Sequence, residues 1–158
     1  MTYEELQVQH DDLNIIEMDL SGVKNLKGLY FNKNIAIEKS LTQKEKACVL
    51  AEELGHHYTS SGNILDQQKT NNIKQEQKAR MWAYNEQIGL LGIVEAYKYG
   101  CQSLHEMADY LDVTEDFLRD ALEAYRLKYG HCINVDNYTV YFEPYLMVAD
   151  FNCYDFNE

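Results

Sequence analysis

The sequence predicts an α+β fold, with a small β-sheet region near the N-terminus, a central helix, and further helices toward the C-terminus. Three observations indicate this class. Short strand-like segments come first, a capped helix with an apolar stripe starts at Thr42, and more segments with helix-cap signals follow. With 158 residues, 46% of them hydrophobic, the chain is long enough to bury a core.

The N-terminal part of the chain is predicted to contain one helix and three short strands. Residues 3–13 place two leucines at a helical spacing of seven. Residues 14–18 form a short strand candidate, and the run 28–37 is typical of two strands around the turn Asn32-Lys33-Asn34. Asparagine tolerates the positive φ of tight hairpins, so the turn chemistry favours a hairpin here.

The next segment is predicted to be a long helix from about Thr42 to Tyr58. It begins with the Thr-x-x-Glu pattern of a capping box, in which two side chains satisfy free backbone N–H groups. Its apolar stripe consists of Ala47, Leu50, Ala51 and Leu54. Glu52 and His56 point nearly the opposite way, onto a second face that is otherwise apolar. Polar side chains on a buried face need partners, which is the physical reason to suspect a metal ion.

A polar loop over residues 59–71 and a second long helix over about 72–98 are predicted next, with Gly100 as the stop signal. We expect residues 1–100 to form one core. Residues 101–158 would form a C-terminal helical region with a terminal strand or hairpin, packed as part of the same domain.

The C-terminal region is predicted to start with two capped helices. Ser103 opens a capping box for a short helix to about Leu111, and Thr114 caps a longer helix to about Tyr129. The tail over residues 133–151 alternates well enough for a strand or hairpin.

Composition excludes several classes of protein. The net charge of −12 argues against unspecific nucleic-acid binding and fits either simple solubility or a neutral or basic partner. No run of about 18 apolar residues is present, so we expect no membrane contact. The four cysteines form no Cys-x-x-Cys pair, and the N-terminus lacks the regions of a signal peptide. We therefore expect a cytoplasmic protein with free thiols, in a bacterium or a phage-infected host cell. The oligomeric state is left open.

The segment Leu50–Tyr58 contains a variant of a metal-binding motif. In the His-Glu-x-x-His pattern, two histidines four apart on one helix face hold the metal, and the glutamate activates a water. Here Glu52 stands at the first ligand position, Glu53 at the base position and His56 at the second ligand position.

A shifted register is also possible in principle, with Glu53 and His57 as the pair four apart. It would make Leu54 the base, which leucine cannot be, and it would turn His57 toward the apolar stripe. We therefore prefer the first register and expect His57 to be a satisfied, partly buried histidine. A role for it as a proton donor or oxyanion partner stays open.

Two helical side chains cannot complete a tetrahedral metal site, so a third ligand must come from elsewhere. The best candidate is Glu76, because Glu76, Ala79 and Ala83 share a helix face and the alanines allow a close approach between helices. His105 and His131 are weaker candidates that we expect at the surface. The plain alternative is that the acids are solvated and the two helical histidines interact with the helix dipole.

The string Leu-Ala-Glu-Glu-Leu-Gly-His-His-Tyr-Thr (50–59), followed by Glu-x-x-Ala-x-x-Trp-Ala (76–83), resembles the ImmA/IrrE family of metallopeptidases. The similarity is greatest to the small phage- and mobile-element-encoded branch. It implies a zincin-like minimal metallopeptidase: strands before the motif helix, a second helix that supplies a glutamate ligand, and then helices resembling a helix-turn-helix.

Position by position, the resemblance implies that Glu53 is the general base and that His56 and Glu76 are metal ligands. Glu52 departs from the family pattern, which has histidine there. Glutamate is a competent ligand, so we expect Glu52, His56 and Glu76 to bind Zn²⁺, with Mn²⁺ or Fe²⁺ as alternatives that suit carboxylates. Two carboxylates and one imidazole would neutralise a divalent ion and make it a poorer Lewis acid.

The resemblance implies cleavage of a protein partner, namely a helix-turn-helix repressor of a phage or mobile element, and hence a role in gene regulation. The alternative is a catalytically inactive homologue that binds and sequesters such a regulator. A third possibility is a DNA-binding regulator that uses residues 103–129. The acidic and basic residues mixed along this segment favour protein contact or packing over direct nucleic-acid binding.

Overall fold

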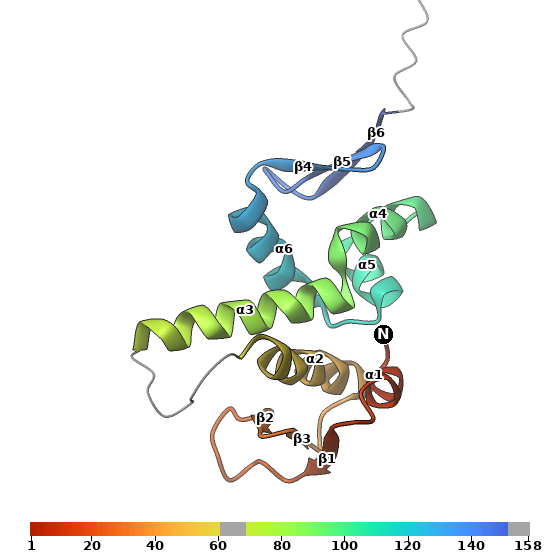
Figure 1. The fold of residues 1–158 in the computed structure, drawn as a ribbon. Coiled ribbons are helices and arrows are strands. Elements are labelled where there is room, and N and C mark those ends of the chain that lie inside the picture. The colour runs from red at the N-terminus through yellow and green to blue at the C-terminus, as the bar shows by residue number, and fades with distance from the viewer. Residues whose placement is uncertain (61–68, 152–158) are drawn as a thin grey trace, which may run out of the picture.

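The computed structural model describes residues 1–60 and 69–151 and confirms the α+β class, with two separate three-stranded sheets and helices between them (Figure 1). The described elements in chain order are α1 (Tyr3–Gln9), β1 (Asn14–Met18), β2 (Gly28–Phe31), β3 (Asn34–Glu38), α2 (Gln43–Thr59), α3 (Lys69–Gln87), α4 (Gly89–Tyr99), α5 (Leu104–Leu111), α6 (Glu115–Tyr129), β4 (Cys132–Val135), β5 (Tyr138–Tyr141) and β6 (Met147–Asp150).

The N-terminal sheet has the strand order β1-β3-β2, with β1 parallel and β2 antiparallel to β3. The predicted hairpin is present, and its two turn residues, Asn32 and Lys33, have φ of 45° and 64°. The first helix is shorter than the predicted 3–13. It ends at Gln9, because the chain turns there and the N–H of Leu13 bonds to the carbonyl of His10 before β1 begins.

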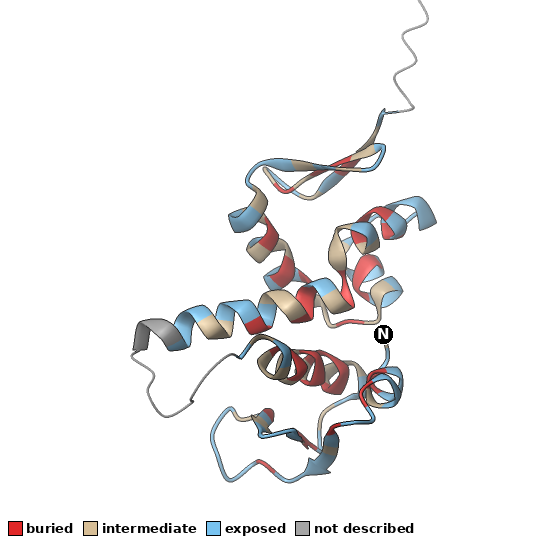
Figure 2. Ribbon diagram, in the orientation of Figure 1, coloured by how far each residue is buried: buried red, intermediate tan, exposed pale blue. Residues whose placement is uncertain are grey.

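Helix α2 lies between the N-terminal sheet and α3 (Figure 1). Its predicted capping box is formed, since the Thr42 hydroxyl accepts from the N–H of Glu45 and the Glu45 carboxylate accepts from the N–H of Thr42. The predicted stripe is the buried face of the helix (Figure 2), and Leu50, Ala51 and Leu54 are fully buried. Burial of this stripe between two layers is what fixes the helix in place.

The prediction of one helix over 72–98 is wrong. Helix α3 already begins at Lys69 and ends at Gln87, and α4 starts at Gly89, where φ is +65°. Glycine adopts this left-handed conformation at no steric cost, so the helix ends there and the chain changes direction. The predicted loop 59–71 is also too long at both ends, since α2 includes Thr59. Its middle, residues 61–68, lies outside the described residues.

The C-terminal helices begin where they were predicted. The hydroxyls of Ser103 and Thr114 accept backbone N–H groups at the starts of α5 and α6. Only half of the predicted box at Ser103 forms, because the Glu106 carboxylate accepts from the N–H of Gln102 instead. The tail forms an antiparallel sheet, β4-β5-β6, one strand more than the predicted hairpin.

One buried hydrophobic cluster includes residues from α1, α2, α3, α4, α5, α6 and both sheets. The boundary predicted at residue 100 stays a prediction. Within the described ranges, no helix is both long and apolar enough to cross a bilayer.

Candidate metal centre

The candidate centre lies where α2 and α3 pack together. Ala79 and Ala83 are fully buried in this contact, and Gly55 of α2 faces the backbone of Ala79. A methyl group on Gly55 would lie 2.8 Å from the carbonyl carbon of Ala79, so only glycine allows the two helices to approach this closely. The small residues therefore set how far the polar side chains of α2 are from those of α3.

Across this contact the structure brings His56 and Glu76 together. The Nε2 atom of His56 is 3.2 Å from Oε2 of Glu76, and the two side chains are 27% and 42% exposed. The pair joins residues twenty positions apart in the chain and comes from two separate helices. It places an imidazole nitrogen and a carboxylate oxygen, two common zinc-ligand types, side by side.

Glu52 precedes His56 by one helical turn and is partly buried. Burial raises the pKa of its carboxyl group, the positive charge of Arg80 opposes that rise, and the charge of Glu76 adds to it. The structure does not join Glu52 to the other two as a finished site. Among the residues that it describes, no three His, Cys, Asp or Glu side chains are arranged to hold a metal ion.

The Glu53 side chain lies against strand β2. The backbone N–H of Tyr30 donates a hydrogen bond to its carboxylate. Gly28 allows this close approach, because a Cβ atom there would lie 2.8 Å from Oε1 of Glu53 and 2.6 Å from Cγ1 of Val49. Burial first, and then the negative charges of Glu52 and Glu76, raise the pKa of Glu53 to about 7. A carboxyl group with such a pKa can take up and release a proton near neutral pH.

His57 is partly buried, and its Nδ1 atom is 2.9 Å from the hydroxyl oxygen of Tyr30. Its ring also packs edge-on against Tyr58, which stacks on Trp82. The satisfied environment expected for His57 is therefore present. Tyr30 contacts both Glu53 and His57, and sequence reasoning missed it because nothing in the strand pattern distinguishes it.

Sequence reasoning also missed Arg80. Its Nε atom is 3.0 Å from Oε1 of Glu76, so Glu76 contacts His56 with one oxygen and Arg80 with the other. The spacing of four residues between Glu76 and Arg80 on one helix is a signal that could have indicated this ion pair.

The two other candidate histidines lie at the surface, as expected. His105 is 70% exposed and pairs with Asp109 and Glu115, and His131 is 60% exposed beside Glu143. Their acidic partners all lie outside the candidate centre.

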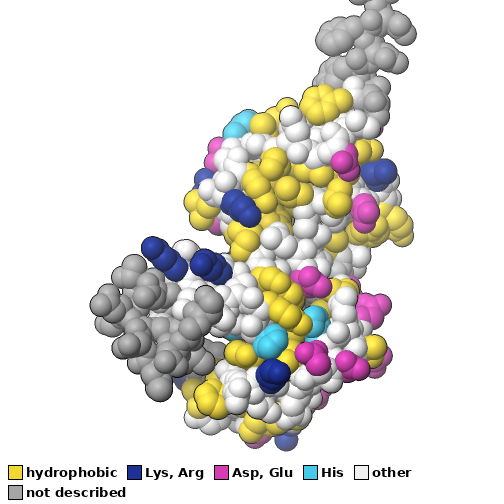
Figure 3. Space-filling view, viewed as in Figure 1, with side chains coloured by type: hydrophobic (Ala, Val, Ile, Leu, Met, Phe, Trp, Pro, Cys, Tyr) yellow, Lys and Arg dark blue, Asp and Glu magenta, His cyan; other side chains and the backbone are white. Residues whose placement is uncertain are grey.

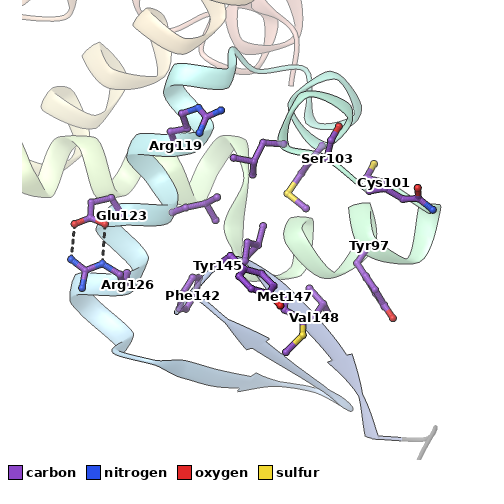
Figure 4. A pocket seen from close by; sticks show the side chains of 15 residues that line it. Tyr97, Cys101, Ser103, Arg119, Glu123, Arg126, Phe142, Tyr145, Met147 and Val148 are labelled. Carbon is purple, nitrogen blue, oxygen red and sulfur yellow. Dashed lines mark hydrogen bonds and ion pairs between the residues drawn. The ribbon is translucent and has the colours of Figure 1, made fainter.

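A separate cavity of about 610 Å³ opens between α5, α6 and the C-terminal sheet (Figure 4). Its wall includes Tyr97, Leu122, Phe142, Met147 and Val148, with Arg119 and Arg126 of α6 at the side. Hydrophobic side chains gather on this face of the molecule, over the C-terminal elements (Figure 3). None of the candidate metal ligands lines this cavity. We place the candidate chemistry at the α2–α3 contact instead.

The side chains at that contact fit a divalent metal ion in their chemistry. An imidazole faces a carboxylate across two helices, and a second carboxylate lies one turn away on α2. A protein-family model, described as Peptidase_M78, IrrE N-terminal-like domain, matches residues 8–123. The match covers well over half of the chain and includes all of these residues. No curated protein and no solved structure matches the chain at a significant level.

Proposed function

Because the chain belongs to the Peptidase_M78 family of IrrE N-terminal-like domains, we propose that it is a metal-dependent endopeptidase of the ImmA/IrrE type. The membership itself supports a metallopeptidase-type protein. The contact between His56 and Glu76 is the observation that carries the finer proposal, since it places two metal-ligand types on facing helices beside a carboxyl group suited to proton transfer.

In this proposal Glu52, His56 and Glu76 hold the metal ion, and Glu53 is the general base. The ion, when bound, would supply Lewis acidity to a water molecule and to the substrate carbonyl. Glu53 accepts a proton from the attacking water and later delivers it to the leaving amine. The N–H of Tyr30 orients the Glu53 carboxylate for this transfer.

The identity of the metal follows from the ligands. One imidazole and two carboxylates are compatible with Zn²⁺, and the second carboxylate makes Mn²⁺ or Fe²⁺ more acceptable than it would be with two histidines. It also reduces the net positive charge of the loaded site. We therefore propose a catalyst that is slower than one with two histidines, and not an empty site.

The proposed substrate is a helix-turn-helix repressor of a phage or mobile element. Repressors bind DNA through basic surfaces, and the net charge of −12 on this chain would attract such a partner. We propose that cleavage takes place in the cytoplasm, where the repressor acts. No direct contact of this chain with nucleic acid is proposed.

The test combines metal content with cleavage. Elemental mass spectrometry of the wild type should find about one equivalent of metal, which His56→Ala and Glu76→Ala should both lose. If a neighbouring gene encodes a helix-turn-helix repressor, that repressor is the substrate to test first. Glu53→Gln should abolish its cleavage while it leaves metal content and the circular dichroism spectrum unchanged. Wild-type cleavage by Glu53→Gln would remove Glu53 as the base and the mechanism with it.

Two observations favour the alternative of an inactive homologue that sequesters the regulator. Glu76 already holds an ion pair with Arg80, and the described residues contain no finished three-ligand group. This alternative predicts that the repressor binds with equal affinity to the wild type and to Glu53→Gln, with or without a chelator. A loss of full-length repressor that a chelator prevents would exclude it.

A further inference from the structure

Arg80 forms an ion pair with Glu76 at the candidate centre, and the two residues lie on the same helix. Its Nε atom is 3.0 Å from Oε1 of Glu76, while the other oxygen of Glu76 faces His56 at 3.2 Å. Both oxygens of this carboxylate are thus engaged, one of them by a permanent cation.

The charge of Arg80 also acts on Glu52. The two side chains interact electrostatically, so the same guanidinium group stabilises both of the carboxylates proposed as ligands. Glu53 adds a third acid next to them. Three acids in one partly buried site repel one another, and Arg80 offsets part of that repulsion.

From this arrangement we infer that Arg80 is the resident counter-ion of the candidate centre, and that it competes with a divalent cation for Glu76. This inference rests on the proposed function, because it concerns the same site. It deepens that proposal by naming the residue that sets the metal affinity. Arg80 is a positioning residue in this view, since it acts through Glu76.

The release of Arg80 is physically simple. Its side chain is 52% exposed, long and flexible, so it can turn into solvent without disturbing the core. A guanidinium group that stays near the site repels a divalent cation, and one that leaves it loses its partner. Both effects weaken metal binding relative to a site without this arginine. The chain then takes up metal only where the free metal concentration is high enough to displace Arg80.

The test is a zinc titration of the full chain against a chromophoric chelator that competes for Zn²⁺. Arg80→Gln removes the charge, and Arg80→Lys keeps it. The matched control is Arg119→Gln on α6, because Arg119 is 58% exposed and is also paired with a glutamate four residues away. Each variant is compared in the wild-type background and with His56→Ala, which separates binding at the centre from binding at surface thiols.

Arg80→Gln should bind Zn²⁺ about tenfold more tightly than the wild type, as expected for the loss of a nearby positive charge in a partly exposed site. Arg80→Lys and Arg119→Gln should stay within about threefold of the wild type, and the gain should vanish with His56→Ala. Equal or weaker binding by Arg80→Gln, including no binding by any variant, would overturn the inference.

The readout does not depend on cleavage, so the two proposals fail separately. Tighter zinc binding by Arg80→Gln without any proteolysis would support the counter-ion and contradict the endopeptidase. Chelator-sensitive proteolysis with unchanged zinc affinity in Arg80→Gln would support the endopeptidase and contradict the counter-ion.

Discussion

Gly55 of α2 lies directly against the backbone of Ala79 of α3, with no room for a side chain between them. Gly55 precedes His56 in the chain, and Glu76 is one turn before Ala79 on its helix. The contact between two residues without functional groups therefore fixes the separation of the two that we propose as metal ligands.

Gly55→Ala should destabilise the fold and disrupt the candidate centre. Alanine favours a helix over glycine by about 1 kcal/mol, but here its methyl group would overlap the Ala79 carbonyl, and overpacking of a core costs about 1–3 kcal/mol. We expect a net loss of up to about 2 kcal/mol in the free energy of unfolding, measured by urea denaturation, and loss of bound metal.

The control for this prediction is Gly92→Ala, also within a helix. A methyl group there meets only the end of the Leu111 side chain, at 3.2 Å, which can move. Its stability should be unchanged or slightly higher. Equal behaviour of the two variants would mean that the α2–α3 contact is not as restrictive as the structure indicates.

Glu53 should make the stability of the metal-free protein depend on pH. Folding raises the pKa of Glu53 from 4.5 to about 7, so between these values the native state holds a proton that the unfolded chain has released. The contribution of Glu53 is fully present below pH 4.5 and is lost as the pH rises through 7. We expect wild-type stability to fall by about 2 kcal/mol from this group between pH 5 and 8.

Urea denaturation at both pH values, with a chelator present, measures this effect. Glu53→Gln is neutral in both states, so its stability advantage over the wild type should grow with pH. Glu4→Gln, a change of an exposed acid on α1, should follow the wild type. A constant difference between Glu53→Gln and the wild type would show that the pKa of Glu53 is not raised.

Glu52→His should increase the rate of cleavage per bound metal ion. The substitution restores the histidine of the common motif, removes one negative charge from the ligands, and so leaves a stronger Lewis acid; we expect about a tenfold gain. It also removes one of the charges that raise the pKa of Glu53. The rate is to be normalised to metal content from elemental analysis, and a slower variant at equal metal content would contradict the charge argument.

Tyr30→Phe should lower stability by about 1 kcal/mol, because it removes the hydrogen bond of 2.9 Å to His57 and leaves a partly buried nitrogen without that partner. Metal content should not change, since the backbone N–H of Tyr30 still donates to Glu53. Tyr99→Phe, at a residue that is 76% exposed, should cost almost nothing and serves as the control in the same denaturation series. Equal stability of both variants would mean that the hydroxyl of Tyr30 makes no net contribution.

The sequence by itself determined those features that depend on neighbouring residues. The capping box at Thr42, the turn at Asn32 and Lys33 and the helix starts after Ser103 and Thr114 are each decided by local backbone and side-chain hydrogen bonds. The α+β class followed from the order of such elements. The motif around Glu53 indicated the family for the same reason, because its residues are close together in the sequence.

Tertiary structure decided what depends on residues distant in the chain. The break at Gly89 was missed because a glycine inside a helical pattern is compatible with either a continuous helix or a turn, and only packing of α4 beside the C-terminal sheet chooses between them. The third strand of the tail was missed because its pairing partner lies across a loop.

At the candidate centre, spacing could align Glu52 with His56 but could not show how far Glu76 is from them. That distance is set by the contact of Gly55 with Ala79, and the raised pKa of Glu53 is set by its burial and by its neighbours' charges. The position of Arg80 beside Glu76 and near Glu52 is likewise set by the packing of α3 against α2. Charge and distance act through space between separate helices, so they become fixed only when the chain has folded.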